Sequence, residues 1–230
     1  MSYDQQRTRT LSLDTGSVTT VMPASAQRVL RNTYALLGLT LAFSAAVAGT
    51  AMALRLPAPG LILTLVGFYG LMFLVHKFAN SGKGVAAVFA LTGFMGYTLG
   101  PTLNAVLTLP GGAGVITHAL GATAVAFLGL SAIALTTKRD FSFMGKFLMI
   151  GMLVAMALGL GAIFFEIPAL SLAVSGLVVM LMSGMILFET GRIVNGGETN
   201  YVMATVSLFV SVYNLFTSLL MLFGLGGRDE

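Results

Sequence analysis

The chain has 230 residues, of which 57% are hydrophobic and only 9% are charged, and its mean hydropathy is +0.93. Soluble globular domains carry about 25% charged residues, so this composition excludes a soluble protein and predicts a single integral membrane domain. The formal net charge of +4 is better explained by basic loops than by a nucleic-acid-binding surface. The absence of cysteine excludes disulfides and thiol chemistry, and we expect no metal site and no cofactor.

The first 32 residues are polar, rich in serine and threonine, and lack the apolar stretch of a cleavable signal peptide. We therefore expect residues 1–32 to form a flexible tail and the first apolar run to direct insertion into the membrane. By composition alone, this tail is a disordered terminus that is not involved in function, and its arginines only contribute to the excess of positive charge on the cytoplasmic side.

Seven apolar runs are long enough to cross roughly 30 Å of hydrocarbon at about 1.5 Å per residue. They predict an all-α integral membrane protein with seven transmembrane helices within residues 33–226, followed by a short C-terminal segment, 227–230. The expected spans are Thr33–Leu54, Gly60–Val75, Gly84–Leu107, Ala113–Leu135, Phe147–Phe165, Pro168–Val194 and Tyr201–Phe223.

The basic residues gather in alternate loops. With the N-terminus in the cytoplasm, ten of the twelve basic residues lie in cytoplasmic segments and only Arg55 and Arg228 lie outside. Such a bias is typical of the positive-inside rule. We expect a cytoplasmic N-terminus and, because the number of spans is odd, a periplasmic C-terminus.

Small residues at four-residue spacing indicate close helix packing in two of the spans. They are Gly96 and Gly100 in the third, and Gly151, Ala155 and Gly159 in the fifth. Small side chains let helix backbones approach each other in lipid. Pro101 follows directly, and proline removes an amide donor, so we expect it to kink or break the third span.

No catalytic constellation is visible. The two histidines, His76 and His118, do not belong to a nucleophile motif, so an enzyme is not expected. His118 is best interpreted as a packing residue and His76 as a residue of the cytoplasmic boundary, where its titration range would also suit a pH sensor.

Glu189 is the acidic residue placed inside a span. It lies about 31 Å along the sixth helix from Pro168, at or just within the cytoplasmic boundary. A carboxylate there tends to face the bundle interior, pair with a cation or become protonated, and Arg192 is one helical turn away. One interpretation is an interfacial ion pair that ends the span.

The alternative is a polar gate built with the last span and a basic group of the second span. On the last span, polar residues at spacings of four, three and four form one row, although such side chains can also bond backbone carbonyls one turn back. The row is Ser207, Ser211, Asn214 and Ser218, and the candidate bases of the second span are His76 and Lys77.

The stretch between the last two spans predicts a tight turn. Gly196 and Gly197 give it backbone freedom, and Thr199 or Asn200 can cap the final helix.

Four stretches carry a family likeness: GYTLGP (96–101), ALTTKRDFSFMG (134–145), FETGRIVNGGETNY (188–201) and SLFVSVYNLF (207–216). In this order, they resemble the Bax inhibitor-1 family of seven-span membrane proteins, and the likeness extends from about Arg28 to Gly226. Residues 29–45 and 59–74 further resemble the bacterial YccA subgroup, which implies the Bax inhibitor-1 fold in a bacterial inner membrane.

The family includes pH-sensitive calcium leak channels, in which an acid late in span six faces an aspartate in span seven, near an arginine of span two. In this sequence, the position of the first acid corresponds to Glu189. The second position is Ser211, so the acidic pair is not kept, and the span-two base has only Lys77 or His76 as a counterpart.

The YccA subgroup is associated instead with FtsH, a membrane-anchored ATP-dependent zinc protease, as a slow substrate that restrains it. The resemblance therefore implies FtsH and its membrane-associated regulators as partners, engaged through the N-terminal tail with Arg7, Arg9 and Asp14 as candidate residues. A calcium or cation leak is the alternative function. A purely structural partner in a membrane complex is a third.

Overall fold

The computed structural model describes residues 23–137 and 141–226, and in these ranges helices are joined by turns and loops. These ranges contain seven helices, each long and apolar enough to cross a membrane, which confirms the predicted fold class. The helices are α1 (Ala24–Ala53), α2 (Leu61–Phe78), α3 (Lys83–Leu107), α4 (Gly112–Thr136), α5 (Met144–Phe164), α6 (Pro168–Val194) and α7 (Tyr201–Gly226).

Two features of the helices differ from expectation. Helix α1 begins at Ala24 rather than Thr33. Its first turn is closed by a backbone hydrogen bond from the Gln27 amide to the Pro23 carbonyl. Such bonds do not need apolar side chains, so a helix can begin before the apolar run does. Of the kink or break expected at Pro101, the break does not occur, since α3 continues through Pro101 to Leu107. A proline removes only one hydrogen bond of the helix, and the turns around it pack closely against α1.

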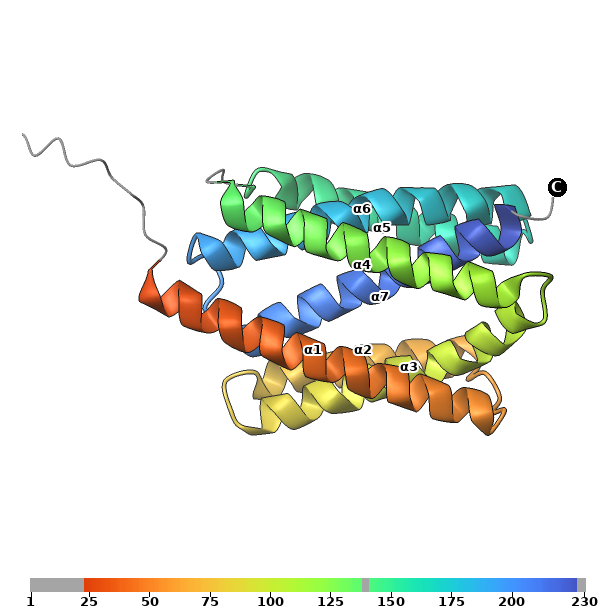
Figure 1. Ribbon diagram of the computed structural model, residues 1–230, viewed down its shortest axis with the longest axis horizontal. Coiled ribbons are helices and arrows are strands. Elements are labelled where there is room, and N and C mark those ends of the chain that lie inside the picture. The colour runs from red at the N-terminus through yellow and green to blue at the C-terminus, as the bar shows by residue number, and fades with distance from the viewer. Residues whose placement is uncertain (1–22, 138–140, 227–230) are drawn as a thin grey trace, which may run out of the picture.

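The helices form two groups of three around α7 (Figure 1). In the first half, α1 and α2 both pack against α3; in the second half, α4 and α5 both pack against α6. Helix α7 runs between the halves and contacts α1, α2, α3, α4 and α6. Its side chains supply much of the buried core, including Leu208, Phe209 and Leu215.

Glycines allow the helices of one half to approach closely. A Cβ added to Gly96 would clash with the Ser44 carbonyl of α1, and one added to Gly100 would lie 3.0 Å from the Ala48 carbonyl oxygen. In the second half, Gly151 of α5 faces the Leu181 side chain of α6. The predicted role of these glycines in packing is therefore confirmed.

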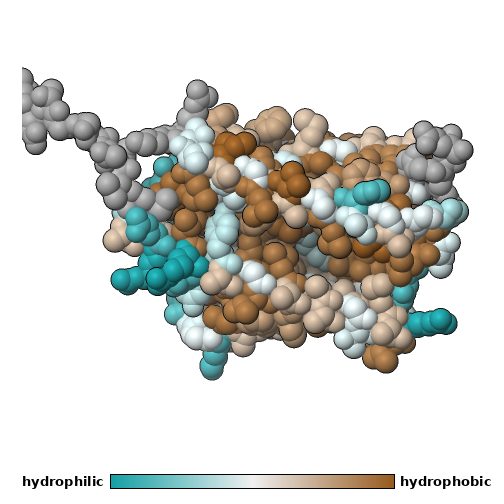
Figure 2. Space-filling view, in the orientation of Figure 1, coloured by the Kyte–Doolittle hydropathy of each residue, from teal (hydrophilic) through white to brown (hydrophobic). Residues whose placement is uncertain are grey.

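The two ends of the bundle differ in charge. Of the seven basic residues that the structure describes, six lie where α1, α3, α5 and α7 begin, an end that we call the basic end: Arg28, Arg31, Lys77, Lys83, Lys146 and Arg192. Arg55 lies at the opposite end. Figure 2 shows hydrophilic residues gathered toward the ends and a hydrophobic surface between them, as expected for a bundle that spans a bilayer.

Candidate functional site

The candidate site lies at the basic end and centres on Glu189, in the last two turns of α6. Only 6% of this side chain is exposed, although it is ionisable. The Arg192 guanidinium, one turn further along α6, donates to both carboxylate oxygens at 3.4 and 3.5 Å. A buried carboxylate needs such a partner, because an unpaired charge away from water is costly.

Arg192 also binds a second carboxylate. Its other terminal nitrogen donates to Glu198 Oε2 at 3.3 Å, from the loop between α6 and α7. The guanidinium in addition lies over the Phe188 ring, 5.6 Å from its centroid. We call Glu189, Arg192 and Glu198 the Arg192 triad; with both carboxylates ionised, its single guanidinium leaves a net charge of −1.

The loop conformation brings Glu198 to this position. Gly196 has a φ of 74°, a left-handed conformation that glycine adopts without strain. The chain then turns back, and the amides of Gly197 and Glu198 both donate to the Arg192 carbonyl, at 2.8 and 3.2 Å. The sequence analysis missed Glu198; the signal was an acidic residue directly after a glycine pair that closes a helix.

Asn200 fixes the other side of the same loop. Its Oδ1 accepts from the amides of Val202 and Met203, so it caps α7 as predicted for Thr199 or Asn200. Its Nδ2 donates to the Ala79 carbonyl and to Asn80 Oδ1, at 3.1 and 2.7 Å. One side chain thus ties the loop before α7 to the loop between α2 and α3.

The polar row of α7 does not extend the triad. Ser211 Oγ donates to the Ser207 carbonyl at 2.8 Å, and Asn214 Nδ2 donates to the Val210 carbonyl at the same distance. Both bonds stay within α7. The row therefore bonds backbone carbonyls one turn back, which was the alternative to a polar gate. Throughout the described part of the chain, the hydrogen bonds of Glu189 go to Arg192 alone.

The remaining predicted residues also lie apart from Glu189. His76 is exposed at the end of α2, and its Nδ1 donates to the Met72 carbonyl at 2.8 Å. Lys77 is exposed and lies over the Phe78 ring. Arg192, not a base of the second span, therefore pairs with Glu189. The tail candidates Arg7, Arg9 and Asp14 lie outside the described residues, and His118 is exposed on α4 rather than packed.

Two hydroxyl contacts link the neighbourhood of the triad to α1. Tyr34 Oη lies 3.3 Å from Thr190 Oγ1, next to Glu189, and Thr205 Oγ1 of α7 donates to the Thr33 carbonyl at 3.3 Å. Sequence reasoning did not find these residues, because a single hydroxyl inside an apolar span does not indicate its partner. They hold α1 against α6 and α7 beside the triad.

Comparison with known proteins identifies the family. The family model described as "Inhibitor of apoptosis-promoting Bax1" matches residues 26–228. "Modulator of FtsH protease YccA" of Escherichia coli K12 is 55% identical over 205 residues, which are 89% of this chain and 93% of the relative. An uncharacterised Pseudomonas aeruginosa protein is 54% identical over 88% of this chain and 91% of its own length. A Vibrio cholerae membrane protein is 43% identical over 88% of this chain and 92% of its own length. This chain therefore belongs to the Bax inhibitor-1 family of multi-pass membrane proteins.

Proposed function

We propose that this protein modulates the FtsH protease, as a slow substrate that occupies and restrains it without catalysing a reaction itself. The observation that carries this proposal is the 55% identity to the Escherichia coli protein named as a modulator of that protease, across 89% of the chain. The high coverage matters, because the 205 matched residues must include most of the helical bundle that the mechanism below requires.

The charge distribution supports an orientation. Six of the seven described basic residues lie at the basic end, and cytoplasmic segments of membrane proteins are rich in lysine and arginine. We infer that the basic end faces the cytoplasm of a bacterial inner membrane, which leaves the C-terminus in the periplasm. The tail before Ala24 is then on the cytoplasmic side, and we infer that the protease grips it there.

The packing of α1 explains why degradation would be slow. A protease that pulls on the tail unfolds α1 first, and α1 is the helix that meets Gly96 and Gly100 of α3 at close range. The same helix is bonded to α6 through Tyr34 and to α7 through the Thr33 carbonyl. Since unfolding rates depend on contacts that must break early, a tightly held first helix prolongs occupancy of the protease.

Reconstituted proteolysis tests the proposal. Purified FtsH degrades a reporter membrane substrate in the presence or absence of this protein. We expect the full-length protein to slow reporter degradation and to be degraded slowly itself. A variant lacking residues 1–22 keeps all seven described helices and should lose the inhibition and become long-lived. A variant with Arg7, Arg9 and Asp14 changed to alanine tests whether those side chains are gripped.

Two results would contradict the proposal. One is an unchanged rate of reporter degradation with and without the full-length protein. The other is an unchanged lifetime of the protein after removal of residues 1–22. Co-purification with the protease without either effect would instead indicate a structural partner.

A cation leak is the second candidate function, and the buried carboxylate of Glu189 in the Arg192 triad is the observation that favours it. The experiment is calcium flux into liposomes between about pH 5 and pH 8, where histidines and perturbed carboxylates titrate. A leak of this kind should be abolished by Glu189→Gln and retained by Glu166→Gln, an exposed glutamate at the opposite end. Flux no greater than that of protein-free vesicles at every pH removes this candidate.

A further inference from the structure

The two halves of the bundle leave an open seam between α1 and α4. These helices lie on either side of α7 in Figure 1, and in the described chain their backbones do not pack against each other. Helix α7 forms the floor of the seam through Phe209, Val212 and Phe216. The seam is therefore bounded on three sides by protein and open on the fourth to the surroundings of the bundle.

A crevice of about 430 Å³ occupies the middle of this seam, and its lining is almost wholly apolar. Leu41 and Ala45 of α1 form one wall, and Leu120 and Ala124 of α4 form the other. Leu120 is 54% exposed, so the crevice opens outward at the level of the apolar surface. The Thr123 hydroxyl in the lining donates to the Ala119 carbonyl and needs no other partner.

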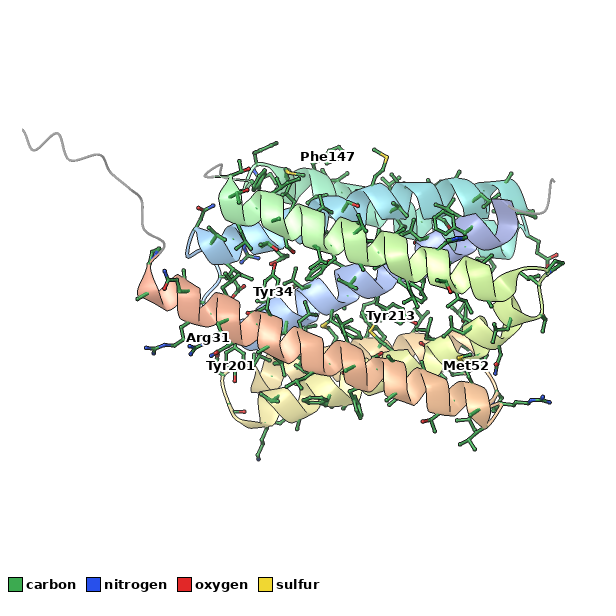
Figure 3. The ribbon with its side chains drawn as sticks, viewed as in Figure 1. Arg31, Tyr34, Met52, Phe147, Tyr201 and Tyr213 are labelled. Carbon is green, nitrogen blue, oxygen red and sulfur yellow. The ribbon has the colours of Figure 1, made fainter. Side chains whose placement is uncertain are left out.

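A second cavity, of about 330 Å³, lies in the same seam at the basic end. Its lining includes the polar side chains of Gln27 and Arg31 as well as Tyr34. The Tyr34 ring contacts the Phe127 ring of α4 at a centroid distance of 5.8 Å, and Phe127 in turn lines the apolar crevice. Figure 3 shows Tyr34 and Tyr213 in the space between α1 and α4; Tyr34 lines the second cavity, and Tyr213 lines the apolar crevice.

We propose that this seam binds one phospholipid from the leaflet at the basic end, with its phosphate at Arg31 and one acyl chain in the apolar crevice. Arg31 supplies the positive charge that a phosphate requires, and arginine forms bidentate hydrogen bonds with it. From Arg31 to Ala45, α1 rises about 21 Å. One leaflet including its headgroup region is about 20–22 Å thick, so a lipid with its phosphate at Arg31 can reach the level of Ala45, and both cavities are within the reach of one lipid.

The volume of the crevice is that of a site for a small molecule or a single lipid chain. Its size falls within the range of about 300–1,000 Å³ typical of small-molecule sites.

Native mass spectrometry of the delipidated full-length protein tests this inference with phosphatidylglycerol carrying 16- and 18-carbon chains. We expect one lipid to be retained more tightly than any later one. Ala124→Phe fills the crevice, and Arg31→Gln removes the phosphate partner. Each should weaken the retained lipid about tenfold, the effect of losing one charged hydrogen bond or a comparable contact. A diacylglycerol with the same chains should bind the wild-type protein as weakly as phosphatidylglycerol binds Arg31→Gln.

Matched variants serve as controls. Ala157→Phe places the same ring on an exposed position of α5, and Lys146→Gln removes an exposed charge at the same end but outside the seam. Both should retain the lipid like the wild type, and thermal unfolding monitored by circular dichroism should show that all four variants are folded. Absence of a tightly retained lipid, or equal losses in seam and control variants, would overturn the inference. Binding by this seam does not depend on the proposed relation to FtsH.

Discussion

Helices pack very differently within a half of this bundle and between its two halves. Within the first half, Gly96 and Gly100 bring α3 so close to α1 that a single added carbon would clash. Between the halves, α1 and α4 leave two cavities, and the halves are joined through the buried side chains of α7 and through individual side-chain bonds. In lipid, where apolar surface gains little by meeting apolar surface, helix association depends on close packing, which small residues allow, and on polar bonds.

The same helix therefore combines a sealed face and an open face. The sealed face of α1 resists removal of the helix, which suits a slow substrate. The open face keeps its apolar side chains in contact with the bilayer, which suits a lipid site. We expect mutations at the sealed interface to have the largest effects and mutations of individual side-chain bonds to have the smallest.

Breaking the sealed interface should have the largest effect. Gly100→Leu forces a side chain against Ala48 and Ala51 of α1, and overpacking of this kind costs about 2–3 kcal/mol. Unfolding in mixed micelles should report that loss, and degradation by FtsH should accelerate. Gly121→Leu is the control, because nothing lies within 4 Å of a Cβ at Gly121. Equal stability of the two variants would show that the interface is not sealed.

Removing the central cation of the Arg192 triad should have the next largest effect. Arg192→Met leaves Glu189 buried without a partner, which costs about 2 kcal/mol after allowance for the 34% exposure of Arg192. The unfolding free energy of the double variant Glu189→Gln with Arg192→Met should recover part of the loss, since a neutral amide needs no cation. A double variant no more stable than Arg192→Met would contradict the pairing. Lys146→Met controls for loss of charge at this end.

Cutting one tie between the halves should cost less. Asn200→Ala removes the cap of α7 together with the bonds to Ala79 and Asn80, and loss of a cap typically costs about 1 kcal/mol. Hydrogen exchange at the first amides of α7 should increase in this variant. Thr199→Ala, at the neighbouring exposed position, should leave both stability and exchange unchanged. The reverse ranking would assign the cap to Thr199.

The smallest effect is expected at the floor of the open seam. Tyr213→Phe removes the hydrogen bond between α7 and Thr98 of α3, at 2.9 Å, and such bonds within membranes average about 0.6 kcal/mol. The ring remains to line the crevice, so lipid retention should not change. A loss well above 1 kcal/mol would mean that polar bonds, not glycine contacts, dominate the packing.

Much of the fold could be predicted because span length and turn chemistry are local. Proline at the start of α6 and the Asn195–Gly196 pair after it delimit that helix, whose observed bounds are the predicted ones. The start of α1 could not be predicted from hydropathy, since its first turns are polar. The continuity of α3 through Pro101 depends on packing against α1, which no local pattern shows.

The candidate site could be predicted only in part. Glu189 and Arg192 are one turn apart on one helix, so their pairing follows from the helical period. Glu198 reaches Arg192 only because the chain reverses at Gly196, and Tyr34 meets Thr190 across 156 residues. The seam could not be predicted from the sequence for a similar reason. Helices that are apolar on every face do not indicate which neighbouring helix each face contacts.

The unequal ends of the bundle have an electrical consequence. In the described chain, the basic end has a surplus of four positive charges, whereas Arg55 and Glu166 balance each other at the opposite end. Moving one charge through the membrane potential involves about 2.3 kcal/mol per 100 mV, so inverting the bundle would cost about 9 kcal/mol at that voltage. Withdrawal toward the basic end carries only the balanced pair across the bilayer. With the basic end in the cytoplasm, as proposed, the membrane potential would favour this orientation and, among the described charges, would not oppose extraction toward the basic end.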